Sequence, residues 1–142
     1  MERSRRSLTP IHVYAAVVLT NYAAQVAYAA HLYGAAFSHS GALLLGSTLA
    51  WFVLGYLLVV GRRPAGYWVF LTYVAAQCAF YFHGEVLLAL AGYGLPFQLA
   101  HARDPLVWVV FVIGDSNFIA AALVLGFLLW RRQAFTGRGP AS

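Results

Sequence analysis

The chain has 142 residues, of which 62% are hydrophobic and only 9% are charged, and its formal net charge is +5. Soluble domains are about 45–50% apolar and about 25% charged. The composition therefore argues against an ordinary soluble domain and predicts an all-α integral membrane protein. Nucleic acid is not an expected partner, because the positive charge follows a topological pattern that is described below.

Four apolar segments are each long enough to cross a bilayer, which takes about 20 helical residues. We expect transmembrane helices at about 10–33, 42–60, 66–89 and 107–130. Short connections make consecutive helices antiparallel, so the pattern predicts an up-down-up-down bundle, with residues 1–142 as one domain. The first segment resembles a signal peptide, but it is long and carries Asn21 and Gln25, so we expect it to be retained.

The arginines predict the orientation of this bundle in the cell membrane. The chain has nine arginines and no lysine. Eight of them lie before the first segment, between the second and third, or after the fourth, and only Arg103 lies on the other side. Basic residues accumulate on the cytoplasmic side of membrane proteins. We therefore expect a multi-pass protein with both termini in the cytoplasm.

The sequence also contains an internal similarity. Residues 19–31 (LTNYAAQVAYAAH) and 71–83 (LTYVAAQCAFYFH) agree at seven of thirteen positions, and VLGYLL at 53–58 corresponds to VLGFLL at 124–129. These matches predict two tandem helical hairpins related by a pseudo-two-fold axis along the membrane normal. The halves are about 10–65 and 66–134, and the second has a longer outer segment, 91–106, which we expect to form an interfacial lid.

Polar side chains recur on one face of the first and third segments. Because lipid offers no hydrogen bonds, these amides and phenols should face the bundle interior. The expected substrate-binding residues are Gln25, Gln77, Tyr81, Tyr28, Tyr73 and Asn117. The alternative is that the amides only form hydrogen bonds between helices.

Two acidic residues are specific to the second half of the chain. Asp115 should lie at about the depth of Gln77, and Glu85 nearer the outer surface. An ionisable group within a membrane is costly and is commonly functional, so Asp115 must face a water-filled cavity or remain protonated. We therefore predict acid–base catalytic roles for Asp115 and Glu85. The alternative is that Asp115 is a structural partner of Arg103 or His83.

Three functions are consistent with this pattern. The first is a cofactor-free enzyme that isomerises or cyclises a lipophilic isoprenoid- or sterol-like substrate in an outer-leaflet pocket. The second is a small transporter or non-catalytic membrane subunit, and we expect so small a bundle to form a homodimer. The third is electron transfer through haem, a metal or a quinone held by His31 and His83. Cys78 is the only cysteine, so no thiolate metal site is expected within one chain.

Overall fold

The described part of the chain is helical. The computed structural model describes residues 8–33, 39–92, 100, 103 and 105–136. Its four long helices are α2 (Thr9–Tyr33), α3 (His39–Val60), α4 (Pro64–Leu90) and α6 (Pro105–Trp130), and the short α7 (Arg132–Thr136) follows. Each predicted span therefore falls on a helix, with ends within three residues of the predicted ones. Most of the predicted lid, 91–106, lies outside the described residues.

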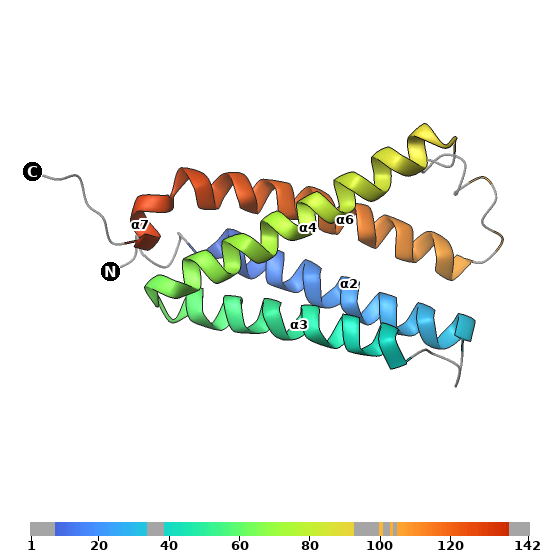
Figure 1. Ribbon diagram of the computed structural model, residues 1–142, viewed down its shortest axis with the longest axis horizontal. Coiled ribbons are helices and arrows are strands. Elements are labelled where there is room, and N and C mark those ends of the chain that lie inside the picture. The colour runs from blue at the N-terminus through green and yellow to red at the C-terminus, as the bar shows by residue number, and fades with distance from the viewer. Residues whose placement is uncertain (1–7, 34–38, 93–99, 101–102, 104, 137–142) are drawn as a thin grey trace, which may run out of the picture.

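Consecutive long helices run antiparallel and form an elongated bundle (Figure 1). The most extensive packing joins α3 to α4 and α2 to α6, and α4 also packs on α6. The sequential pair α2 and α3 is the most loosely packed of these neighbours. Figure 1 shows that α4 crosses the bundle obliquely, starting beside α3 and ending far from it. The axes of α3 and α4 are therefore close together at their shared turn and far apart at their other ends (Figure 1).

The α3–α4 turn is a tight helix C-cap followed immediately by a new helix. The Arg62 amide donates to the Val59 carbonyl at 3.1 Å and the Arg63 amide to the Leu58 carbonyl at 2.9 Å. Arg62 adopts the left-handed conformation with φ 56°, where glycine is usual. Pro64 then starts α4, where its missing amide hydrogen costs nothing. A Cβ on Gly66 would lie 2.3 Å from the Leu58 carbonyl carbon, so the two helices touch through their backbones.

The core consists mainly of aromatic rings in the half of the bundle next to this turn. The Tyr14 ring meets Phe52 and Phe70 edge-on, with centroids 6.4 and 6.1 Å away. Tyr73 packs on Phe52 at 5.3 Å. All four side chains are almost completely buried, which brings α2, α3 and α4 together on one apolar cluster. Aromatic pairs of this geometry add stabilisation beyond their buried area.

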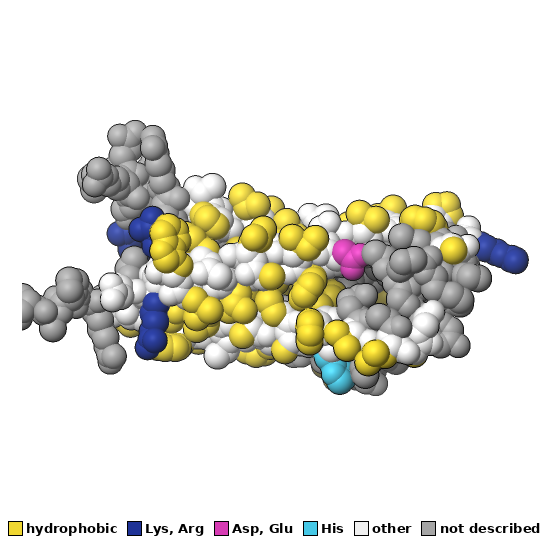
Figure 2. Space-filling model, turned by 90° about the horizontal axis from the view of Figure 1, so that it is seen from above, with side chains coloured by type: hydrophobic (Ala, Val, Ile, Leu, Met, Phe, Trp, Pro, Cys, Tyr) yellow, Lys and Arg dark blue, Asp and Glu magenta, His cyan; other side chains and the backbone are white. Residues whose placement is uncertain are grey.

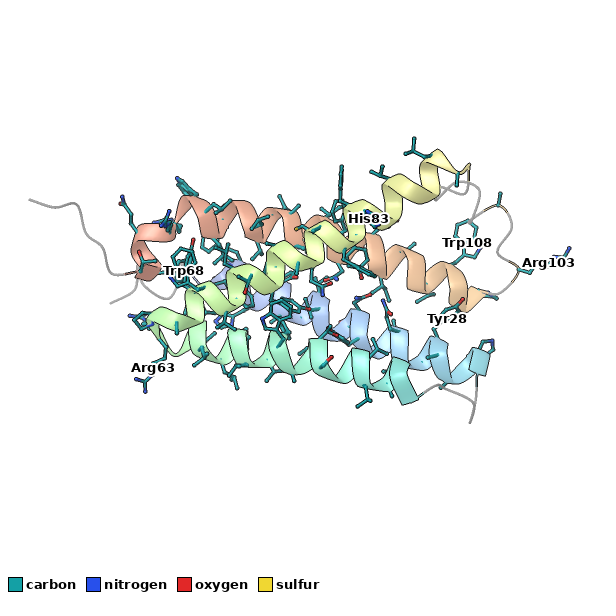
Figure 3. The ribbon with its side chains drawn as sticks, in the orientation of Figure 1. Tyr28, Arg63, Trp68, His83, Arg103 and Trp108 are labelled. Carbon is teal, nitrogen blue, oxygen red and sulfur yellow. The ribbon has the colours of Figure 1, made fainter. Side chains whose placement is uncertain are left out.

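The face of the bundle shown in Figure 2 is mainly apolar along its length, and basic side chains lie at both ends. One end, hereafter the basic end, carries the arginine pairs that follow α3 and α6, Arg62 with Arg63 and Arg131 with Arg132, and Arg103 lies at the far end (Figure 3). Two segments, Thr9–His31 and Val112–Trp130, are long and apolar enough to span a membrane by length and composition, while Leu45–Val60 is apolar but shorter. Membrane association is thus indicated for two helices, and α4 is not clearly apolar enough by this measure.

Positions that the internal similarity pairs are alike in burial between α2 and α4 but not between α3 and α6. In α2, Tyr14, Ala15 and Val18 are buried, and so are the matching Gly66, Tyr67 and Phe70 of α4. In the other pair, the buried positions of α3 correspond to exposed positions of α6: Phe52 to Leu123, Gly55 to Gly126 and Val59 to Trp130. The positions of α6 that share the burial of α3 lie two residues earlier, at Ala121, Val124 and Leu128.

Candidate functional site

A cavity of about 330 Å³ lies where α4 diverges from α3. It is lined by α2, α3 and α4, is partly open to the outside, and none of its lining side chains carries a formal charge. The lining residues are Asn21, Tyr22, Gln25, Leu45, Thr48, Trp51, Ala76, Gln77 and Phe80. An apolar cavity with a few convergent neutral polar groups is typical of a small-molecule site.

The two glutamines that the internal similarity matched both line this cavity. Gln25 comes from α2 and Gln77 from α4, and both side chains are half-buried. Each amide offers an oxygen acceptor and two N–H donors. Together they provide hydrogen bonds of both kinds to a neutral molecule, while offering no charge to neutralise an ion.

A buried polar cluster of Asn21, Tyr81 and Asn117 borders the cavity and connects three helices. The Asn21 Nδ2 group donates to the Tyr81 hydroxyl at 3.1 Å, and the Asn117 Nδ2 group donates to the same oxygen at 3.4 Å. Asn21 is 6% exposed and Asn117 1%. The Oδ1 atoms of both asparagines have no hydrogen-bond partner in the described chain.

This cluster cannot satisfy both carbonyl oxygens by itself. A phenol has one proton to donate, and rotating either amide to accept it would leave that amide's N–H groups unpaired. A buried acceptor without a donor costs about 1–3 kcal/mol. Asn21 also lines the cavity, but its Oδ1 atom is buried beneath neighbouring protein atoms and is not exposed to the cavity.

The two predicted tyrosines outside this cluster do not line the cavity. Tyr73 belongs to the aromatic core, where its ring meets Trp51 edge-on at 5.8 Å. Trp51 lines the cavity, so Tyr73 supports its wall from behind. Tyr28 is half-buried on α2 and lies closer than His83 to the far end of the bundle, where Trp108 and Arg103 lie (Figure 3).

Asp115 lies on another side of the bundle. It is half-buried on α6, three residues before Phe118 and seven before Ala122, and therefore on the same side of that helix. Phe118 and Ala122 line a groove of about 520 Å³ between α4 and α6. Asp115 is the one acidic side chain among those described, and it is the magenta group on the surface in Figure 2. The Glu85 backbone belongs to α4, but its side chain lies outside the described residues.

Asp115 and Asn117, two residues apart, thus have separate surroundings. Asn117 is the buried partner of Tyr81, whereas Asp115 faces the side of the bundle. The structure does not bring the Asp115 carboxyl to the cavity that holds Gln25 and Gln77. An acid–base reaction on a molecule in that cavity would need a different proton donor.

His31 and His83 are both exposed, on α2 and α4. Figure 3 places His83 near the crossing of α4 and α6. Among the described residues, no three His, Cys, Asp or Glu side chains cluster closely enough to hold a metal ion. The His12 Nδ1 atom lies 2.9 Å from the Tyr56 hydroxyl, which gives this further histidine a structural contact between α2 and α3.

We did not predict from the sequence that α3 would contribute to the wall of the cavity. Thr48, Trp51 and Leu45 come from α3, and Tyr22 and Phe80 complete the apolar lining. The signal available was Ser47-Thr48, adjacent hydroxyl residues within an otherwise apolar helix, followed three residues later by a tryptophan. One helical turn separates Thr48 from Trp51, so both face the same side.

Comparison with known proteins gives no match. No family model fits the sequence, and no curated protein or solved structure is significantly similar to it. The functional argument therefore depends on the geometry of the cavity and its neighbours.

Proposed function

We propose that the protein is a multi-pass membrane protein that binds a neutral lipophilic molecule in the cavity between α2, α3 and α4. The observation that carries this proposal is the convergence of Asn21, Gln25 and Gln77 on an otherwise apolar, uncharged cavity. Groups of this kind select a molecule with a hydroxyl, carbonyl or amide head and an apolar body. Such a binding protein would serve as a carrier or as a lipid-binding subunit.

In this proposal all four long helices span the membrane, with both termini in the cytoplasm. The exposed surface supports this, since large apolar side chains such as Leu57 (61% exposed) on α3 and Leu123 (70%) on α6 lie on the outside of the bundle. A soluble protein rarely exposes so extensive an apolar surface. The arginines at the basic end support the orientation. The matching burial of α2 and α4 supports two tandem hairpins. In these hairpins the buried positions of α6 lie two residues before the positions that the VLGYLL–VLGFLL similarity pairs with buried residues of α3.

The test is mass spectrometry of lipids that co-purify with the protein. We expect a neutral lipid to be enriched over the host membrane in the wild type and reduced in Gln77→Leu. The matched control is Thr72→Val, since Thr72 is exposed on the same helix and donates only to the Trp68 and Val69 carbonyls. Equal lipid content in Gln77→Leu and Thr72→Val would contradict the proposed site.

The second candidate is an acid–base enzyme whose substrate occupies the α4–α6 groove and meets Asp115. Its specific support is the half-buried carboxyl that continues the groove-lining side of α6. Such an enzyme would exchange protons between water and an alkene. Incubation with squalene in D₂O would then give deuterated lipid with the wild type and Ser116→Ala but not with Asp115→Asn. Equal deuteration by all three proteins would exclude this role.

A further inference from the structure

The cavity borders an apolar groove on the side of the bundle. This groove has a volume of about 650 Å³ and lies between α2 and α3, the loosely packed pair. Tyr22 and Leu45 line both the groove and the cavity. The remaining groove residues are apolar, and its floor includes the small residues Ala23, Ala27 and Gly46.

The two spaces differ in what they offer a ligand. The cavity is lined by the amide side chains of Asn21, Gln25 and Gln77. The groove is a slot without amides, bordered by exposed side chains such as Leu19. A molecule that satisfies both has a small neutral polar head and an unbranched apolar chain.

We propose that the cavity and the groove form one site for a neutral single-chain amphiphile of the long-chain alcohol class. The hydroxyl head lies in the cavity, donates to the Oε1 atom of one lining glutamine, Gln25 or Gln77, and accepts from the Nε2 group of the other. The chain passes between Tyr22 and Leu45 and lies along the groove between α2 and α3. This assignment rests on the proposed function and specifies its ligand class.

The uncharged lining explains why the head must be neutral. A fatty acid would bring a carboxylate to a cavity whose lining residues include no cation. Burying an unpaired charge is far more costly than burying a hydroxyl that is hydrogen-bonded. An alkane would fill the groove but give the glutamine amides of the cavity no hydrogen-bond partner. The site thus distinguishes an alcohol from both the acid and the hydrocarbon of the same chain length.

Photolabelling in phosphatidylcholine nanodiscs tests this assignment. The probes are a hexadecanol and an octanol, each with a diazirine in the chain, and competitors are unlabelled hexadecanol, palmitate and hexadecane. We expect hexadecanol to label α2 and α3 residues of the groove and to be displaced by unlabelled hexadecanol alone. Labelling confined to α6, or displacement by palmitate, would overturn the assignment.

Two glycine variants provide a matched pair. A Cβ on Gly46 or on Gly126 would meet nothing within 4 Å, so both positions accept a larger side chain. Gly46 lines the α2–α3 groove and Gly126 the α4–α6 groove. Gly46→Trp should lower hexadecanol labelling by about tenfold or more, since losing about two buried methylenes suffices for that factor. Octanol labelling should persist, and Gly126→Trp should change neither.

The outcomes separate this inference from the proposed function. If neither alcohol labels the wild type while a neutral lipid still co-purifies in a Gln77-dependent manner, the alcohol assignment fails and the proposed function stands. If no such lipid co-purifies either, both fail. If octanol binds but Gly46→Trp does not weaken hexadecanol labelling, the cavity stands and the groove assignment fails. If Gly46→Trp dissociates a dimer without changing hexadecanol labelling, the groove belongs to a second copy of the chain, and the assignment is again overturned.

Discussion

Replacing Tyr81 by phenylalanine should measure how strongly the buried polar cluster holds the bundle together. The substitution removes one oxygen and keeps the ring. That oxygen accepts hydrogen bonds from Asn21 at 3.1 Å and from Asn117 at 3.4 Å, on two different helices. Both amides are nearly or fully buried, so their N–H groups would be left without the partner that they have in the wild type.

The expected loss of stability follows from these two bonds. Hydrogen bonds between helices in membrane proteins contribute about 0.6 kcal/mol each, up to about 1.7. Losing two should therefore destabilise the protein by about 1–3 kcal/mol. Tyr56→Phe is the matched control, because it removes the same atom from an exposed bond to His12. We expect this control to cost about 0.5 kcal/mol or less, as exposed groups can bond to water instead.

Reversible unfolding in mixed micelles, followed by circular dichroism, gives both values. A double variant that combines Tyr81→Phe with Asn117→Leu should recover part of the loss, because it removes the stranded amide together with its partner. The reasoning would be refuted if Tyr81→Phe and Tyr56→Phe had the same free energy of unfolding, or if adding Asn117→Leu lowered stability as much as it does alone.

Three further predictions concern packing, topology and cofactors. Gly66→Ala should lower the free energy of unfolding by about 1–3 kcal/mol, because the added Cβ would overlap the α3 backbone. Gly126→Ala should raise it by up to about 1 kcal/mol in the same unfolding assay, because its Cβ would meet nothing within 4 Å. In a cysteine-free background, Arg62→Cys should react with a membrane-impermeant maleimide only from the cytoplasmic side and Arg103→Cys only from the other, and the reverse would contradict the orientation. Purified protein should lack a Soret band, since the side chains of His31 and His83 are both exposed. A haem spectrum lost in either histidine variant would contradict this.

The helical segments could be predicted because they depend on local sequence. Runs of apolar residues set the helix lengths, Pro64 and Pro105 mark two helix starts, and the arginine pairs mark the basic end. Face assignments within one helix were equally accessible, since a fixed angle of rotation per residue separates Asp115 from Asn117. The match between Gln25 and Gln77 likewise predicted that the two amides would face a common interior, and both line the cavity.

What depends on contacts between helices could not be read from the sequence. Matching positions of the similar motifs VLGYLL and VLGFLL differ in burial, because burial depends on which neighbouring helix each face meets. Gly66 brings the α3 and α4 backbones together at the basic end, and the oblique course of α4 then opens the cavity. The sequence alone determined which residues are polar within apolar helices. The tertiary structure decided that Asn21, Gln25 and Gln77 share a cavity while Asp115 does not, because the crossing of the helices sets which faces meet.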